Sequence, residues 1–139
     1  MSFSTKIRVR YADTDCMKVV YYGHYLTYFE VARVEFLRAQ GHAMSDVDQK
    51  VHMPVVEAVV RYHKPALLDD LLEARCWIAE RKRASFRFGY ELLNDRGERV
   101  ATGSTLHACW DPVTSRMIAV SGWLAAIMPV ASSPPPPAV

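Results

Sequence analysis

Residues 22–40 constrain the fold most, because their apolar side chains follow helical spacing and also occupy more than one side of the helix. The main stripe consists of Tyr25, Leu26, Phe29, Ala32, Phe36 and Leu37, and Tyr28, Val31 and Val34 add apolar groups elsewhere. A helix with so little polar surface is predicted to be buried nearly all round, so the rest of the chain has to wrap it. Gly41 is expected to end it in the left-handed conformation.

The wrapping is predicted to be an antiparallel sheet. Residues 6–11 alternate in polarity, with Ile7, Val9 and Tyr11 on one face. Further strands are expected at 55–63, 72–78, 85–92 and 99–110, and the turn 94–97 joins the last two as a hairpin. The fold class is therefore predicted as α+β, with one long helix covering one face of a five-stranded sheet.

Length and charge favour one soluble domain. A chain of 139 residues can bury one core without a disulfide or metal, and we expect a domain at 1–130, with a short helix at 122–128, and a flexible, proline-rich tail at 131–139. The net charge of +2 does not indicate a nucleic-acid partner. Three cysteines without paired spacing suggest reduced thiols in the cytoplasm, and no apolar run predicts a membrane span.

Asp15 is the strongest candidate for a reacting group, because it precedes a helix whose first N–H groups lack partners. A helix cap is the alternative role for such an aspartate. Cys16 has no histidine at a spacing typical of a nucleophile pair, and a buried structural thiol is its commoner role. The histidines at 24, 42, 52, 63 and 107 show no ligand pattern, so no metal site is predicted.

Several motifs in residues 6–110 resemble those of one known family. Asp13-Thr14-Asp15, Val19-Val20-Tyr21-Tyr22-Gly23-His24-Tyr25-Leu26 and Phe29-Glu30-Val31-Ala32-Arg33 resemble the signature of the 4-hydroxybenzoyl-CoA thioesterase branch of the hotdog-fold acyl-CoA thioesterases. Arg61-Tyr62-His63-Lys64-Pro65-Ala66 and Arg81-Lys82-Arg83-Ala84-Ser85-Phe86 resemble the family's second strand and its basic loop.

The resemblance implies a hydrolase that releases a free acid from a thioester of coenzyme A, without metal or organic cofactor. It implies that Asp15 is the catalytic carboxylate and that the backbone N–H of Tyr22 binds the thioester carbonyl, while Asp13 orders the turn. Tyr25 is expected at the substrate site, and Arg81, Lys82 and Arg83 near the phosphates of coenzyme A. A homodimer or homotetramer is expected.

The chain departs from the family at two positions. Lys18 stands where a glycine is usual, so it either adopts an ordinary backbone conformation or brings an ammonium group near the substrate. His24 stands where an asparagine is usual, and it either replaces that polar group or titrates near neutral pH and perturbs Asp15.

Two other functions remain open on the same fold. A non-hydrolytic module that binds acyl-CoA or an acyl carrier protein would need no working carboxylate, and Asp15 argues against it. A hotdog dehydratase would use a histidine and carboxylate pair, which His24 makes conceivable.

Overall fold

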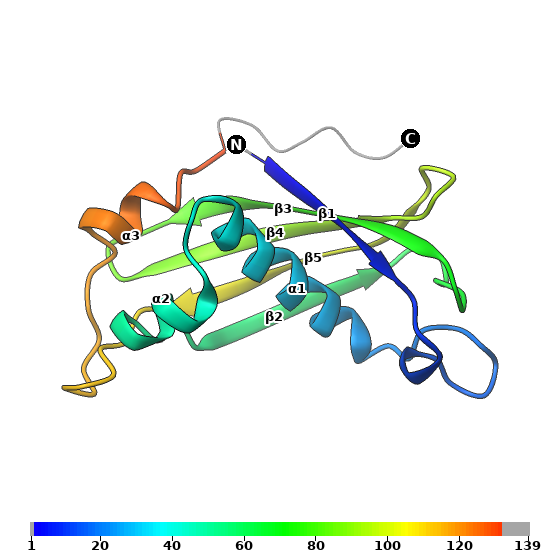
Figure 1. The fold of residues 1–139 in the computed structure, drawn as a ribbon, viewed down its shortest axis with the longest axis horizontal. Coiled ribbons are helices and arrows are strands. Elements are labelled where there is room, and N and C mark those ends of the chain that lie inside the picture. Colours follow the sequence, from blue (N-terminus) through cyan, green and yellow to red (C-terminus); the bar gives the residue numbers. More distant parts are fainter. Residues whose placement is uncertain (1, 132–139) are drawn as a thin grey trace.

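One α-helix lies across one face of a five-stranded antiparallel sheet in the computed structural model (Figure 1). The structure describes residues 2–131, so the predicted tail lies outside the described residues except for Ala131, whose N–H bonds the carbonyl of Ile78. The strands are β1 (Ser2–Arg8), β2 (Val55–Tyr62), β3 (Leu71–Arg81), β4 (Ser85–Leu93) and β5 (Arg99–Ala108). Their order across the sheet is β1-β3-β4-β5-β2.

The central strands form because their sequences alternate strictly. Leu72, Ala74, Cys76 and Ile78 of β3 are buried beneath the helix, and Phe86, Phe88, Tyr90 and Leu92 of β4 are buried beside them. The hairpin at 94–97 is confirmed, with Gly97 at φ +76° and its N–H bonded to the carbonyl of Asn94.

The first strand was predicted too late in the chain. It spans Ser2–Arg8, and Tyr11 lies in a short 3-10 turn at Tyr11–Asp13, where its side chain is 69% exposed. Val9 lies beyond the strand but stays buried, so the alternation in the sequence runs past the end of β1. The ladder between β1 and β3 ends at Arg8, and the N–H of Val9 bonds the carbonyl of Asp70. The last strand also ends earlier than expected, at Ala108.

The principal helix, α1 (His24–Ala39), packs one side against the sheet. Phe29 stacks on Tyr90 of β4 with ring centroids 4.3 Å apart, and Gly103 of β5 gives this ring the space that a Cβ atom would fill. Gly41 has the expected left-handed φ of +87° beyond the end of the helix. The prediction of burial nearly all round was wrong for this single chain, because Leu26 and Val31 remain 39% and 37% exposed.

Two shorter helices cover the end of the sheet that lies away from the start of α1 (Figure 1). Helix α2 (Met44–Lys50) was not predicted, because a single buried residue, Val47, anchors it. Helix α3 (Gly122–Ala126) falls within the short helix expected at 122–128. None of the helices in the described part of the chain is long and apolar enough to cross a membrane.

Candidate active site

The segment before α1 folds back on itself and carries Asp15 to the start of the helix. A β-bridge pairs Thr14 with Val20, and the N–H of Asp15 bonds the carbonyl of Val19 at 2.9 Å. The Asp15 carboxylate accepts a hydrogen bond of 2.8 Å from the N–H of Met17, and its residue is only partly buried. This carboxylate is therefore oriented by its own loop and remains accessible.

Asp13 anchors this loop to the core. It is 2% exposed, and its carboxylate accepts hydrogen bonds from the Arg10 guanidinium at 2.8 Å, from the Arg10 N–H at 3.1 Å and from the Tyr28 hydroxyl at 2.8 Å. Burial alone would raise the pKa of Asp13, but the hydrogen bonds from Arg10 and Tyr28 outweigh it and lower the pKa. Its carbonyl also accepts from the N–H of Tyr21. Asp13 thus orders the turn, as expected.

The helix start presents free N–H groups. The N–H of His24 bonds the carbonyl of Tyr21, whereas the N–H groups of Tyr22 and Gly23 make no backbone hydrogen bond within residues 2–131. Because the helix dipole adds positive potential here, these two groups can bind a developing oxyanion. Unpaired N–H groups were expected near Tyr22 to His24, with Tyr22 as the carbonyl donor; those of Tyr22 and Gly23 have no backbone partner among the described residues, whereas that of His24 has one.

Tyr62 is a functional candidate that the sequence analysis named only within a motif. Its hydroxyl donates a hydrogen bond of 2.9 Å to the carbonyl of Tyr22, which orients the peptide whose N–H belongs to Gly23. Tyr62 lies at the end of β2, forty residues away, so only the tertiary fold brings the two together.

Lys18 takes the left-handed conformation, with φ +63°, so the turn that a glycine would form is preserved. Of the two alternatives for Lys18, the ordinary backbone conformation is therefore excluded. Its ammonium group donates a 2.7 Å hydrogen bond to the Tyr11 hydroxyl, which lowers the pKa of Tyr11. Cys16 is exposed, which contradicts the expected buried role.

His24 and Tyr25 begin the helix but face different surroundings. The His24 ring packs edge-on against Tyr21, with centroids 5.8 Å apart. Tyr25 is buried, its hydroxyl accepts from the N–H of Ala66, and burial raises its pKa. Tyr22, Tyr25 and Tyr62 line one open hollow beside Val20, which places the tyrosines around the helix start.

The basic loop does not reach this site within one chain. Arg81 is the last residue of β3, and Lys82 and Arg83 follow it. At about 3.3 Å per residue Arg81 lies about 33 Å from the first residue of β3, at the end of the sheet opposite the start of α1 (Figure 1). Arg81 donates to the carbonyls of Ala125 and Met128, and Lys82 pairs with Glu80 at 3.6 Å. Arg81 therefore fastens the segment around α3.

Potential metal ligands do not gather anywhere in residues 2–131, where no group of three histidine, cysteine or acidic side chains is placed to hold an ion. All three cysteines are free thiols, and burial raises the pKa of Cys76 to about 12 and that of Cys109 to about 11.

Comparison with known proteins defines the class to which this fold and site belong. The model of the thioesterase-like superfamily matches residues 9–139, and the chain belongs to this superfamily. It is similar to the acyl-CoA thioester hydrolase YbgC of Escherichia coli, with 32% identity over 80% of this chain and 84% of the relative. It is also similar to the 1,4-dihydroxy-2-naphthoyl-CoA hydrolase of Thermosynechococcus vestitus, with 30% identity over 73% of this chain and 70% of the relative.

A solved structure supports the same assignment. The DHNA-CoA thioesterase of Staphylococcus aureus superimposes with a TM-score of 0.83 and 32% identity, covering 90% of this chain and 85% of that one. This likeness supports the hotdog fold that the motifs implied.

Proposed function

We propose that Asp15 and the N–H groups at the start of α1 hydrolyse a thioester of coenzyme A to a free acid and the coenzyme A thiol. The relatives confirm the prediction of an acyl-CoA thioester hydrolase at the level of the reaction. The assignment of residues depends on one observation. The bridge between Thr14 and Val20 ties the loop of the accessible Asp15 carboxylate to the segment before α1, where the N–H groups of Tyr22 and Gly23 make no backbone hydrogen bond within residues 2–131.

The geometry suits the chemistry of a thioester. Attack on the carbonyl carbon turns the carbonyl oxygen into an oxyanion, which the N–H groups of Tyr22 and Gly23 can bind without reorganising. Asp15 either attacks the carbon itself, which displaces the thiolate and leaves an anhydride for water to open, or takes a proton from an attacking water. Both routes consume one water and release one acid and one thiol.

We also propose that two chains pair along β2. This strand hydrogen-bonds only β5 among the described strands, and seven of its eight residues are exposed. An unpaired edge of this kind readily adds another strand. In an antiparallel pair, the start of one β2 lies beside the end of the other. The second chain would then cover the exposed side of α1, as the expected wrapping requires, and either a dimer or a tetramer of such pairs fits.

The same pairing would bring the basic loop of one chain close to the coenzyme A bound at the other. The hairpin with Arg81, Lys82 and Arg83 lies at the end of the sheet where β2 begins, since Ser85 pairs with Ala108 and Val55 pairs with His107. In an antiparallel dimer this end of one chain lies beside the Asp15 end of its partner. The loop can therefore bind the phosphates only of a coenzyme A whose thioester lies at the Asp15 of the partner subunit. Lys82 and Arg83 are available for this role, since Arg81 binds carbonyls near α3.

The narrower assignments are proposals of the same kind. We place the chain in the 4-hydroxybenzoyl-CoA branch, and two of its relatives are named for an aromatic acyl group or its abbreviation. A reducing cytoplasm is proposed as its location because the cysteines are unpaired, although Cys16 is exposed. Cell fractionation of the native protein would test the location.

Release of free thiol from a panel of aromatic and aliphatic acyl-CoA esters tests the function. We expect turnover of at least one ester by the wild type. Binding of acyl-CoA without thiol release would instead indicate a binding module, and loss of water from a hydroxyacyl-CoA would indicate a dehydratase. Light scattering at micromolar concentration tests the pairing, which a monomer would contradict.

A further inference from the structure

One side-chain contact closes the loop that carries Asp15. The Lys18 ammonium group donates a hydrogen bond of 2.7 Å to the Tyr11 hydroxyl, and the same nitrogen lies 4.1 Å from the centroid of the Tyr11 ring. A cation over an aromatic ring is attracted by the electrons of its face, so the two contacts reinforce each other. Because Asp15 lies between Tyr11 and Lys18 in the chain, this contact encloses it in a short loop.

Tyr11 is the fixed side of this contact. It opens the 3-10 turn Tyr11–Asp13, and its carbonyl accepts hydrogen bonds from the Thr14 N–H at 3.1 Å and from the Thr14 hydroxyl at 2.8 Å. The turn ends at Asp13, which is buried and accepts a hydrogen bond from the Tyr28 hydroxyl of α1. The backbone of Tyr11 is therefore tied to the core of the protein.

Lys18 lies on the exposed side of the contact. Its neighbour Met17 is 72% exposed and Cys16 is exposed as well, so burial does not hold the tip of the loop. Lys18 also has a φ of +63°, which is unfavourable for a residue that has a Cβ atom. A conformation of this kind persists only where the surrounding contacts determine it. The bond to Tyr11 is such a contact, and the side chain that makes it is one that a glycine would lack.

The backbone beside Lys18 orients the Asp15 carboxylate. The N–H of Lys18 bonds the carbonyl oxygen of Asp15 at 3.0 Å, and the N–H of Met17 bonds the Asp15 carboxylate at 2.8 Å. These two donors belong to adjacent residues, so a displacement of Lys18 would move both of them. The Lys18 carbonyl in turn accepts from the N–H of Leu68 at 3.0 Å. The direction of the carboxylate thus depends on where Lys18 is held.

We propose that the bond between Lys18 and Tyr11 acts as a clamp that holds the Asp15 carboxylate in its reactive orientation. Lys18 and Tyr11 are then positioning residues, and the Lys18 ammonium group does not bind the substrate. This inference rests on the proposed role of Asp15. A group that only orients the carboxylate affects the reaction step more than the binding of the substrate, so loss of the clamp should lower kcat and leave KM nearly unchanged.

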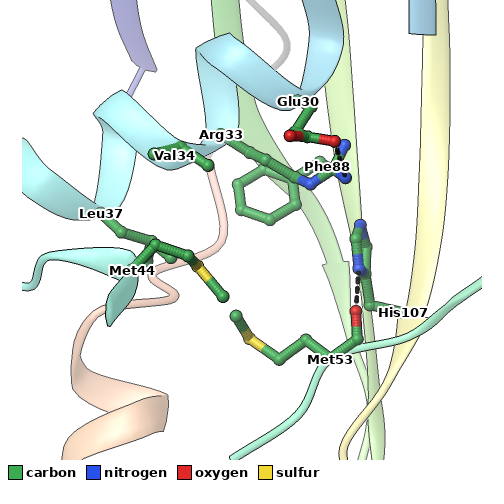
Figure 2. A pocket seen from close by; sticks show the side chains of 8 residues that line it. All are labelled: Glu30, Arg33, Val34, Leu37, Met44, Met53, Phe88 and His107. Atoms are coloured by element: carbon green, nitrogen blue, oxygen red, sulfur yellow. Dashed lines mark hydrogen bonds and ion pairs between the residues drawn. The ribbon is translucent and has the colours of Figure 1, made fainter. Parts of the chain in front are cut away.

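The clamp lies apart from the cavity beneath α1, which has a volume of about 210 Å³ (Figure 2). Figure 2 shows Met44 and Met53 facing each other across this cavity, with Phe88 and His107 beside them. The lining residues belong to α1, to the segment 44–53 and to the strands β4 and β5, and not to the loop that carries Asp15. Loss of the clamp should therefore leave this cavity intact, and kcat should fall by a similar factor for every acyl group.

Two substitutions remove the bond in different ways. Tyr11→Phe deletes the hydroxyl and keeps the ring, whereas Lys18→Asn introduces a residue that adopts the left-handed conformation readily but is too short to reach Tyr11. Each should lower kcat about 3-fold to 10-fold, with KM unchanged, on both an acyl-CoA ester and the matching N-acetylcysteamine thioester. A change in KM alone, or a loss confined to the acyl-CoA ester, would mean that the ammonium group binds the coenzyme and would overturn the inference.

The double variant tests whether both residues act through one bond. Tyr11→Phe combined with Lys18→Asn should lose no more than about 2-fold beyond the slower single variant, because the second change removes nothing further. Losses that multiply as if the two residues were independent would overturn the inference.

Two more substitutions of lysine complete the comparison. Lys18→Arg retains a donor long enough to reach the Tyr11 hydroxyl, so it should be faster than Lys18→Asn, and an equal loss would contradict the clamp. Lys6→Asn is the matched control, because this exposed lysine of β1 pairs with Glu73 at 3.7 Å and lies outside the loop. Its kcat should equal that of the wild type.

Hydrogen–deuterium exchange of peptides that cover residues 14–19 separates this inference from the proposed function. The N–H groups of Asp15, Met17 and Lys18 are hydrogen-bonded within the loop, so their exchange reports how well it is held. Tyr11→Phe leaves these residues unchanged and should speed their exchange at least about 3-fold, without changing that of β4. This result would support the clamp even if no thioester were hydrolysed. An unchanged exchange rate would overturn it even if Asp15→Asn abolished hydrolysis.

Discussion

Asp13→Asn should destabilise the protein strongly, because it removes the charge from a carboxylate that is 2% exposed and accepts hydrogen bonds from two residues. Hydrogen bonds to a charged group contribute about 1.5–3 kcal/mol each, and asparagine keeps some of them in neutral form. The exposed Arg10 side chain is screened by water, so most of the loss comes from the Tyr28 hydroxyl and the Arg10 N–H. We expect a loss of about 2–3 kcal/mol in the free energy of unfolding.

Urea unfolding followed by circular dichroism measures this loss, which corresponds to roughly 6–10 °C in Tm for a domain of this size. Asp46→Asn is the control, since Asp46 is exposed in the first turn of α2 and should change stability by less than about 0.5 kcal/mol. An Asp13→Asn protein as stable as the control would refute the anchoring role.

The pH dependence of this difference gives an independent check. The pKa of Asp13 is lower in the folded protein than in the unfolded chain, so the unfolded chain binds its proton at higher pH. The stabilisation is therefore complete above the unfolded pKa of about 3.9 and is lost as the pH falls through the folded pKa. The gap between wild type and Asp13→Asn should be constant from about pH 7 to 5 and shrink below about pH 4. A gap that widens with acid would contradict this reasoning.

Three further changes have distinct expected outcomes. Gly103→Ala should lower stability by about 2 kcal/mol or more in urea unfolding, because a Cβ atom there would lie 2.2 Å from a backbone oxygen; an unchanged midpoint would contradict this close packing. Tyr62→Phe should lower kcat about 10-fold without changing Tm, since it frees the carbonyl that orients the oxyanion donors, and an unchanged kcat would argue against this role. Arg81→Ala should lower Tm, because it removes two hydrogen bonds to carbonyls. The double variant Lys82→Ala with Arg83→Ala should instead raise KM for acyl-CoA but not for an N-acetylcysteamine thioester, which lacks the phosphates. Equal losses on both esters would exclude phosphate binding.

The sequence predicted best what depends on local pattern. The alternation around Cys76 and Tyr90 identified the buried faces of β3 and β4, and Gly41 and Gly97 marked a helix end and a hairpin turn. Each of these features depends on neighbours along the chain.

Features set by tertiary contacts were missed. The position of β2 beside β5 depends on pairing between distant residues, and the use of Arg81 to bind carbonyls near α3 cannot be deduced from a basic run. Lys18 adopts a conformation typical of glycine because the surrounding hydrogen bonds fix the turn. The hydrogen bonds that link Tyr90 through Thr105 to His107 depend on the register of β4 and β5, which the sequence does not reveal.

The rate of thiol release by Asp15→Asn tests the central claim most directly. An amide can neither attack the thioester nor accept a proton from water, so kcat on the best substrate should fall about 100-fold to 10,000-fold while Tm stays unchanged. Cys16→Ala, at the exposed neighbouring position, should keep wild-type turnover. An Asp15→Asn protein with wild-type kcat would show that the reacting carboxylate lies elsewhere.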